Sequence, residues 1–312
     1  ALMDIVNQFT GTLHVYIGQP SVWLLVFCYA LLIGFCLIPL DARRLCTLAL
    51  AAVALCLAVI ILRPAVSEDL RLSVVDVGQG TGCTYQTANG RWLVFDTGPG
   101  ADTVAQYLRY CGVDRIDAIV LTHSDLDHIG GCAHILRDFN VRQLLASSYA
   151  QTTDEWQALV PYLGDTEVVS VNEPMAFRLG DAQLGCDLLA ASEDGGENCN
   201  QVVARLEDDG LSTLFTGDTA AESLDEISWQ QATDLILVPH HGSKNSWDAA
   251  FYDTRQPSLA LISAGRNNRY GHPHAETTDG LSALNIPTLC TADTGAVRIY
   301  AQDGALYYKT GP

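Results

Sequence analysis

The fold of this chain is decided by residues 122–131, which read Thr122-His123-Ser124-Asp125-Leu126-Asp127-His128-Ile129-Gly130-Gly131. The stretch follows the apolar run 118–121, whose length and β-branched residues are typical of a buried strand. Imidazole and carboxylate side chains crowded after a strand suit a loop that holds zinc, manganese or iron. We expect His123 and Asp125 to bind one ion, and Asp127 and His128 a neighbouring one. The two glycines then allow a tight exit into a helix.

The same residues could instead form a polar loop that caps a helix, with Asp127 as the N-cap residue. This alternative explains one aspartate but not two histidines and a further aspartate. Polar residues also follow three other predicted strands, namely Asp96, Asp218 and the pair His240 and His241. Because layered α/β proteins build their sites in the loops after strands, we expect these residues to meet in one cleft. Asp218 would bridge two ions and His241 would complete the second coordination shell, an arrangement that can clamp a phosphoryl group from both sides.

The chain beyond residue 70 consists of short apolar runs separated by Gly, Asp and Asn. Strands are predicted throughout this part, with hairpins and helices between them: a strand at 72–77, hairpins of 201–206 with 212–215 and of 297–301 with 305–309, and helices at 103–111, 221–229 and 275–284. Strands followed by strand–helix units recur in two halves. This order predicts an α/β fold in which two sheets lie face to face with helices outside.

Two apolar runs near the start of the chain, residues 22–40 and 45–62, contain 19 and 18 residues without a charge. As a helix each would reach about 27–28 Å, enough to cross a hydrocarbon core of about 30 Å. Because neither run has a polar face, the sequence favours a transmembrane helical hairpin over two buried core helices. Two arginines in the connection 41–44 favour a cytoplasmic turn and an extracytoplasmic remainder, while Arg63 opposes this orientation.

The predicted organisation is a membrane segment over residues 1–64, a linker over 65–69 and a globular domain over 70–312. We expect the chain to be a piece of a longer protein, because it begins at Ala1 without an initiator methionine. Residues beyond 64 hold 34 of the 36 acidic and 14 of the 17 basic residues, a net charge of −20, which does not favour general binding of polyanions. Six cysteines of this part would permit disulfides in an oxidising compartment, although spacing does not give their pairing: Cys83, Cys111, Cys132, Cys186, Cys199 and Cys290.

Six motifs occur in order along the chain: Val75-Asp76-Val77-Gly78-Gln79-Gly80, Phe95-Asp96-Thr97-Gly98, residues 121–131, Thr216-Gly217-Asp218, Val238-Pro239-His240-His241-Gly242-Ser243 and Tyr270-Gly271-His272-Pro273-His274. As a set they resemble the metallo-β-lactamase-fold hydrolase domain that ends ComEC-type competence DNA-uptake channel proteins. The resemblance covers about residues 70–310. The preceding apolar hairpin is similar to the end of that family's membrane channel portion. What the resemblance implies is an αββα sandwich with a dinuclear metal site.

The resemblance also implies roles for individual residues. Carried over by position, the metal ligands are His123, Asp125, Asp127, His128, Asp218 and His241, and the residues expected to take part in catalysis are Asp96, Asp127, Asn200, His240 and His272. Asn198 and Asn200 lie where the wider fold often places another ligand histidine. Asp125 replaces a histidine ligand, which shifts the expected cofactors toward manganese, so two divalent ions, Mn²⁺ or Zn²⁺, are predicted. Thr81 departs from the acidic residue that the family usually has after Val-Gly-Gln-Gly.

The function implied by the resemblance is that of a metal-dependent phosphodiesterase or nuclease. It would degrade DNA at the outer face of a bacterial membrane during competence DNA uptake. Its partners would be DNA, the membrane and the rest of a DNA-uptake channel that is missing from this chain. A second hypothesis is a hydrolase of another envelope phosphodiester, of the phosphocholine or teichoic-acid type, which a domain of this negative charge also suits. A third is a non-catalytic cap of a DNA channel.

Overall fold

The computed structural model describes residues 69–189, 200–302 and 304–311, together with scattered helical positions at 26, 29, 30, 33, 44, 47–49 and 51–54. Most of the predicted transmembrane runs 22–40 and 45–62, and all of the linker 65–69 except its last residue, lie outside the described residues. No helix among the described residues is long and apolar enough to span a bilayer. The transmembrane hairpin, its orientation and the boundary at residue 64 therefore stay predictions.

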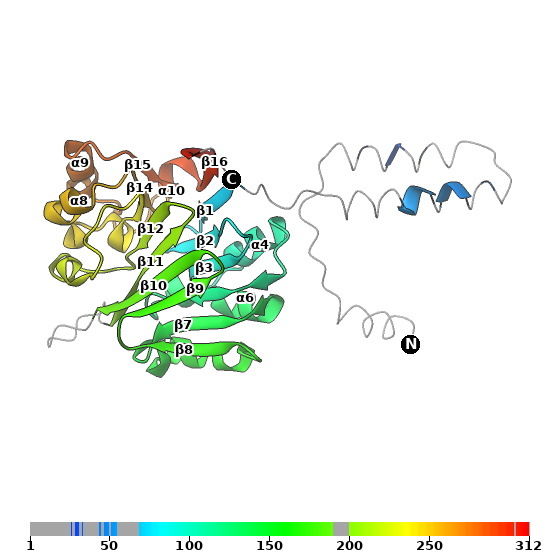
Figure 1. The fold of residues 1–312 in the computed structure, drawn as a ribbon, viewed down its shortest axis with the longest axis horizontal. Coiled ribbons are helices and arrows are strands. Elements are labelled where there is room, and N and C mark those ends of the chain that lie inside the picture. The colour runs from blue at the N-terminus through cyan, green and yellow to red at the C-terminus, as the bar shows by residue number, and fades with distance from the viewer. Residues whose placement is uncertain are drawn as a thin grey trace. The chain divides into compact units, whose positions relative to one another are not determined.

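The larger of two facing sheets has eight strands and contains both the first and the last strand of the globular part (Figure 1). In spatial order the strands are β17 (Ala305–Gly311), β16 (Ala296–Gln302), β1 (Leu70–Val74), β2 (Gly82–Gln86), β3 (Trp92–Thr97), β5 (Ala118–Val120), β7 (Gln143–Ser147) and β8 (Glu167–Val171). β1 pairs antiparallel with β16, which joins the two ends of the globular part. From β3 to β8 the strands run parallel, so their carboxyl ends reach the same edge.

The smaller sheet has seven strands. In spatial order they are β15 (Thr288–Cys290), β14 (Leu259–Ile262), β13 (Leu235–Leu237), β12 (Leu211–Phe215), β11 (Gln201–Asp208), β10 (Ala182–Leu189) and β9 (Met175–Leu179). β12 to β15 run parallel, while β9 to β12 run antiparallel. The parallel half again gathers carboxyl ends at one edge, and the loops after β12 and β13 start there.

The main hydrophobic core lies between the two sheets. Phe95 of β3 and Phe215 of β12 stack across it, with ring centroids 3.5 Å apart and an interplanar angle of 6°. Leu72, Tyr85 and Leu206 are fully buried members of the same cluster. β3 is buried along its whole length and begins with the apolar run Trp92–Phe95, whereas β1 alternates Leu70, Leu72 and Val74 with Arg71 and Ser73.

Helices cover the outer faces of the sheets, and Figure 1 shows α4 and α6 beside the larger sheet and α8 and α9 beside the smaller one. The helices are α4 (Thr103–Tyr110), α5 (Leu126–Ile129), α6 (Cys132–Asp138), α7 (Asp154–Gln157), α8 (Ala249–Arg255), α9 (Ala275–Ala283) and α10 (Thr291–Thr294). A second apolar cluster joins Phe251 and Tyr252 of α8 and Leu281 of α9 to Ile236 of β13. The predicted layered α/β sandwich is confirmed.

Some predicted elements have other bounds or another type. The predicted helix 221–229 is the 3₁₀ turn η3 (Ala221–Glu226), and the predicted strand 72–77 is β1, which ends at Val74. A two-stranded pair joins β4 (Arg115–Ile116) to β6 (Asn140–Val141). Elements that the sequence did not predict include β4, the helices α7, α8 and α10, and the 3₁₀ turns η1 (Ala150–Thr152), η2 (Val160–Tyr162), η4 (Pro239–Gly242) and η5 (Lys244–Ser246). The cysteines among the described residues are all buried, and none of them forms a disulfide with another: Cys83, Cys111, Cys132, Cys186 and Cys290. Cys199 lies outside the described residues.

Candidate metal centre

The loop after β5 carries the ligand-rich stretch and leads into the short helix α5. Asp125 occupies the N-cap position of α5, but its side chain makes no capping hydrogen bond. Asp127 lies within the first turn of the helix. The alternative in which Asp127 caps the helix is therefore wrong, because neither aspartate caps it. Both carboxylates remain available for a ligand.

Gly130 and Gly131 join α5 to α6, and their role differs from the predicted one. Their φ angles are −59° and −79°, which any residue can adopt, so the turn itself does not require glycine. What excludes a side chain is close contact. A Cβ on Gly130 would lie 2.2 Å from the backbone nitrogen of Gly100, and one on Gly131 would lie 2.2 Å from the carbonyl oxygen of Thr97. The glycines thus let α5 lie directly on the loop after β3, which holds His128 in place.

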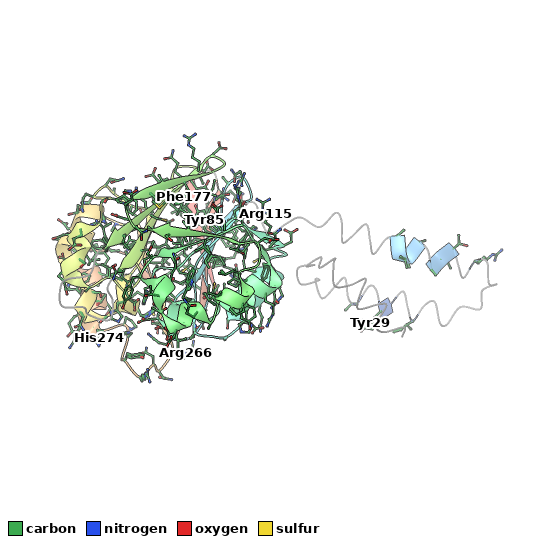
Figure 2. All side chains as sticks on the ribbon, turned by 90° about the horizontal axis from the view of Figure 1, so that it is seen from below. Tyr29, Tyr85, Arg115, Phe177, Arg266 and His274 are labelled. Carbon is green, nitrogen blue, oxygen red and sulfur yellow. The ribbon has the colours of Figure 1, made fainter. Side chains whose placement is uncertain are left out.

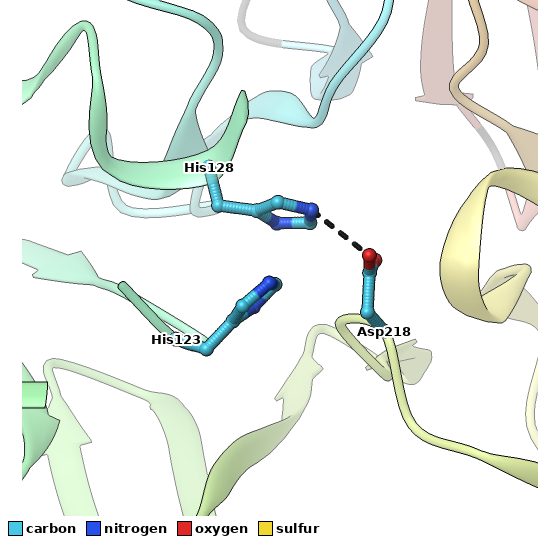
Figure 3. A group of neighbouring side chains, drawn as sticks. All are labelled: His123, His128 and Asp218. Carbon is cyan, nitrogen blue, oxygen red and sulfur yellow. Dashed lines mark ion pairs between the residues drawn. The ribbon is translucent and has the colours of Figure 1, made fainter. Parts of the chain in front are cut away.

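His128 is fully buried between two carboxylates. Its Nδ1 lies 2.7 Å from Oδ2 of Asp96, and its Nε2 lies 3.1 Å from Oδ1 of Asp218. Figure 3 shows the rings of His123 and His128 turned toward Asp218. Asp96 also accepts hydrogen bonds from the backbone nitrogen and the hydroxyl of Thr122, both at 2.8 Å. Asp96 therefore lies behind His128, and a proton held on Nδ1 leaves Nε2 free to ligate.

His241 reaches the same point from the smaller sheet. It lies in η4, after β13, and its Nδ1 donates to the carbonyl oxygen of Ser263 at 2.9 Å. Its Nε2 lies 3.3 Å from Oδ2 of Asp127 and 3.7 Å from Oδ2 of Asp218. As with His128, the hydrogen bond at Nδ1 directs Nε2 toward the cluster.

The ligand atoms of these residues form two overlapping groups. One group is His123, His128 and Asp218, the other is Asp127, His128 and His241, and within each group the atoms lie within 4.8 Å of one another. The Nε2 atoms of the three histidines and Oδ1 of Asp218 are buried and have no hydrogen-bond partner in the described part of the chain. Burying unpartnered polar atoms costs free energy, so their convergence on one point fits a bound cation.

Asp125 lies at the rim of this cluster rather than inside it. Its side chain is about half exposed, and its Oδ2 lies 3.7 Å from Nε2 of His123. His128 has a single free nitrogen, so it can ligate one ion only. All six predicted ligands thus lie in one place, with Asp125 at its rim. Asp218 is the carboxylate that approaches both His128 and His241.

The charges of the cluster are strongly coupled. Burial raises the pKa of Asp127, but the close approach of His241 to its carboxylate and the charges of His128 and His241 outweigh burial and lower that pKa to about 2. Burial likewise opposes the charge of Asp218, and His128 and His241 still bring its pKa well below the ordinary value. Burial lowers the pKa of His128, while Asp218 and Asp96 raise it by more. Both aspartates are thus ionised at neutral pH, as metal ligands must be.

His240 and His272 flank the cluster on its open side. Nε2 of His240 lies 3.6 Å from Oδ2 of Asp218, and the His272 ring is centred 5.5 Å from that of His240 and 6.0 Å from that of His241. Burial, helped by the neighbouring histidines, lowers the pKa of His240 and brings that of His272 to about 4. Both imidazoles are therefore neutral at pH 7.

Several candidate residues have left-handed backbone conformations. The φ angles are 54° at Asp96, 62° at Asn200, 51° at His240 and 54° at His241. Residues with a β-carbon pay for this conformation, and such strain concentrates at functional sites. Asn200 directly precedes β11, and Asn198 lies outside the described residues.

Sequence reasoning missed residues that position the ligands. Oε1 of Gln201, a residue that is 1% exposed, accepts a hydrogen bond from the backbone nitrogen of Asp218 at 3.1 Å. Ser263 donates its hydroxyl to the carbonyl of Gly80 at 2.7 Å, and the backbone nitrogen of Thr81 donates to the carbonyl of Asp127 at 3.0 Å. The Val-Gly-Gln-Gly loop therefore connects the ligand loop to the end of β14. The signal for Gln201 was a polar residue at the start of an apolar strand.

Comparison with known proteins identifies the family to which this chain is similar. The model of the Metallo-beta-lactamase superfamily matches residues 80–266. The chain is 27% identical over 313 residues to ComE operon protein 3 of Bacillus subtilis (strain 168), covering 91% of this chain and 40% of that protein. It is 28% identical over 238 residues to Competence protein ComA of Neisseria gonorrhoeae, covering 74% and 32%. The chain thus spans two fifths or less of the length of these relatives.

The solved structures agree at the level of the fold. The metallo-beta-lactamase fold protein YhfI from Bacillus subtilis superposes with a TM-score of 0.53 at 12% identity, over 77% of this chain and 100% of that one. This likeness concerns the arrangement of sheets and helices alone. With the curated relatives, it confirms the predicted resemblance to the metallo-β-lactamase-fold domain of ComEC-type competence proteins.

Proposed function

Because the chain belongs to the metallo-beta-lactamase superfamily, we propose that it is a metal-dependent phosphodiesterase that cleaves DNA. One observation carries the proposal: buried ligand atoms of His123, His128, Asp218 and His241 meet without hydrogen-bond partners among the described residues. They come from loops of both sheets. His128 can serve one ion only, but Asp218 lies near both His128 and His241, so these imidazoles and carboxylates suit two divalent ions. Sites with two ions are common in enzymes that cleave phosphate esters.

The residues present fit such ions, and their task is to hold the ligand atoms in fixed directions. Divalent ions bound here would activate water and offset the negative charge of a phosphoryl group. Asp96 orients His128, and the carbonyl of Ser263 orients His241. Asp125 adds a carboxylate at the rim, which supports Mn²⁺ beside Zn²⁺ as the cofactor.

His240 and His272 are proposed to hold the phosphate of the substrate. Their lowered pKa values leave both imidazoles neutral at pH 7. A neutral imidazole can donate one N–H to a phosphoryl oxygen but carries no surplus proton for a leaving group. Because both rings flank the open side of the cluster, where a phosphate would approach the ions, we assign them the role of binding the phosphate.

The setting proposed for this activity is the outer face of a bacterial membrane during competence DNA uptake. Two of the relatives described above are named for competence or for a ComE operon. The partners would be the membrane, through residues 1–64, and the rest of a DNA-uptake channel. The net charge of −19 keeps a second substrate class open, an envelope phosphodiester less charged than DNA.

The test is DNA cleavage by the 312-residue chain with added Mn²⁺ or Zn²⁺. We expect divalent-ion-dependent cleavage that Asp127→Ala abolishes, since Asp127 contributes a carboxylate beside His241. Asp253→Ala, which removes an exposed aspartate from α8, is the matched control and should leave the rate unchanged.

Parallel assays with a phosphocholine ester separate the substrate classes. Hydrolysis of that ester without cleavage of DNA would support the envelope phosphodiester. If the chain binds metal and cleaves neither substrate, the non-catalytic cap becomes the better account. Cleavage that survives Asp127→Ala would show that the cluster is not the active site.

A further inference from the structure

The loop between β14 and α9 is unusual in an acidic chain. Residues 263–274 contain no Asp or Glu, although the chain has 36 acidic residues against 17 Lys and Arg. Arg266 and Arg269 both belong to this loop, and both are exposed. Figure 2 labels Arg266 and His274, which bracket the loop, at the same edge of the molecule. A local positive loop allows binding of an anion near the metal centre without general affinity for polyanions.

Three planar side chains of this loop stack in series, and the innermost of them, His272, lies beside a histidine of the metal centre at a tilted angle of 31°. The guanidinium carbon of Arg269 lies 4.7 Å from the centre of the Tyr270 ring. The Tyr270 ring is centred 5.6 Å from that of His272, with an interplanar angle of 19°. His272 in turn lies 6.0 Å from the ring of His241, whose Nε2 faces the cluster. Tyr270 is 48% exposed, so the outer end of the stack faces solvent.

Asn268 holds the stack in position through backbone contacts. Its Nδ2 donates to the carbonyl oxygens of Gly265 at 2.9 Å and His272 at 2.5 Å. Its Oδ1 accepts hydrogen bonds from the backbone nitrogens of Tyr270 at 3.1 Å and His272 at 3.0 Å. A loop that is closed by its own side chain loses little further entropy when a ligand binds.

Arg269 lies within electrostatic reach of the metal centre. Its guanidinium donates a hydrogen bond to the Tyr270 hydroxyl. The pKa of Arg269 is raised by that hydrogen bond and the charge of Tyr270, and to a smaller extent by the negative charge of Asp127. The outer member of the stack is thus a charged, exposed plane.

On the premise of the phosphodiesterase function proposed above, we propose that Arg269, Tyr270 and His272 form a stacking arm that holds a nucleobase of single-stranded DNA beside the scissile phosphate. Guanidinium and aromatic planes stack on bases of any sequence, because every base has a π-face. The charge of Arg269 also attracts the neighbouring phosphates. A base inside a duplex is already stacked on its neighbours, so the arm selects an unpaired strand.

The same geometry disfavours a phosphocholine ester. Aromatic rings also attract quaternary ammonium groups. Arg269, however, places its positive charge over the Tyr270 ring, which repels a choline headgroup. The arginine attracts a nucleotide for the same reason. The stacking arm therefore favours nucleic acid within the wider class of phosphodiesters.

The test compares two substrates of equal charge, a single-stranded oligodeoxynucleotide and an oligomer of the same length made of abasic units. Arg269→Lys retains the charge but removes the plane, and Tyr270→Ala removes the backing ring. We expect each variant to lower kcat/KM for the base-bearing strand by about tenfold and to leave the abasic strand unchanged. Tyr270→Phe should retain most of the activity. Arg178→Lys, at an exposed arginine of β9, is the matched control.

A binding assay separates failure of the arm from failure of the proposed function. Fluorescence quenching of a single 2-aminopurine in the oligonucleotide, measured in the Asp127→Ala background, reports stacking without cleavage. Quenching that Arg269→Lys removes supports the arm even if no DNA is cut. An equal loss on both strands in Arg269→Lys, or unchanged quenching in Tyr270→Ala, overturns it. So does hydrolysis of p-nitrophenyl phosphorylcholine that depends on Tyr270 but not on Arg269.

Discussion

The orientation of His128 depends on one carboxylate behind it. Asp96 accepts hydrogen bonds from Thr122 and from Nδ1 of His128. The free lone pair of His128 is therefore on Nε2, which faces the cleft. Such a carboxylate–histidine pair fixes the tautomer and raises the basicity of the ligand nitrogen. Asp96 therefore acts on the metal centre through His128.

Asp96→Asn tests this contact. Asparagine tolerates the left-handed backbone at residue 96, so the change isolates the carboxylate. An amide that donates to Nδ1 would move the proton of His128 to Nε2 and remove the ligand. We expect metal affinity to fall about 10- to 100-fold, measured by titration with a metal-sensitive dye.

The control for this change is Asp187→Asn. Asp187 of β10 is also a buried carboxylate, and it accepts hydrogen bonds from the backbone nitrogen and the hydroxyl of Ser228, two residues after the end of η3. Its loss should leave metal affinity in the folded protein unchanged. Equal weakening by both variants would mean that Asp96 acts on overall stability rather than on His128.

The sequence predicted the ligands but not the residues that orient them. His123, Asp127 and His128 were visible because they crowd one loop. Thr122 and Gln201 were not, because a buried threonine or glutamine at a strand end looks the same whether or not it supports a ligand. Their roles depend on which loops of the two sheets meet, which local sequence does not contain.

The junction of α5 and α6 packs directly against the backbone of the loop after β3. The predicted reason for its glycines was conformational freedom, and the observed reason is space. A β-carbon at residue 131 would meet the carbonyl oxygen of Thr97 at 2.2 Å, and the hydroxyl of Thr97 in turn donates to the carbonyl of His128 at 2.8 Å. The absence of side chains at residues 130 and 131 therefore fixes the position of α5, which carries Asp127 and His128.

Gly131→Ala should destabilise the protein by about 1–3 kcal/mol, because overpacking against backbone has no easy relaxation. Urea unfolding measures this loss. Gly210→Ala is the comparison, since its φ of 79° makes alanine costly while an added Cβ meets nothing within 4 Å. We expect Gly131→Ala also to weaken metal binding and Gly210→Ala not to. Unaltered metal affinity in Gly131→Ala would contradict the coupling between this junction and His128.

The element predictions held where apolar runs were flanked by clear turns. The hairpin of β16 and β17 and the helix α9 were predicted within a few residues. The segment after Asp218 was predicted as a helix but is a 3₁₀ turn. Its apolar residues Leu224 and Ile227 are both buried against the smaller sheet. Their spacing therefore reflects packing against that sheet and not the periodicity of an α-helix.

At the scale of the whole molecule, the metal centre joins the two sheets. His123, Asp127 and His128 follow β5 of the larger sheet, while Asp218 and His241 follow β12 and β13 of the smaller one. The sequence predicted two facing sheets from the repeated strand–helix order. It did not predict that β1 pairs with β16, because that contact joins residues from opposite ends of the globular part.

A ligand shared between sheets should stabilise the fold as a whole. Mn²⁺ at about 100 times its dissociation constant is expected to add about 2.7 kcal/mol to the free energy of unfolding, and EDTA should reverse the gain. Thermal unfolding with and without the ion measures the effect. In Asp218→Asn the gain should disappear. An undiminished gain in that variant would place the ion elsewhere on the acidic surface.

The left-handed backbone at Asp96, His240 and His241 bears on how such chains drift over evolutionary time. Glycine adopts these angles at lower cost, and asparagine nearly so. Neutral substitution would therefore carry these positions toward glycine or asparagine in any lineage that no longer uses the cleft. Histidine found at both 240 and 241 across related chains would therefore be a sign of continued selection, and comparison of their sequences alone would reveal it.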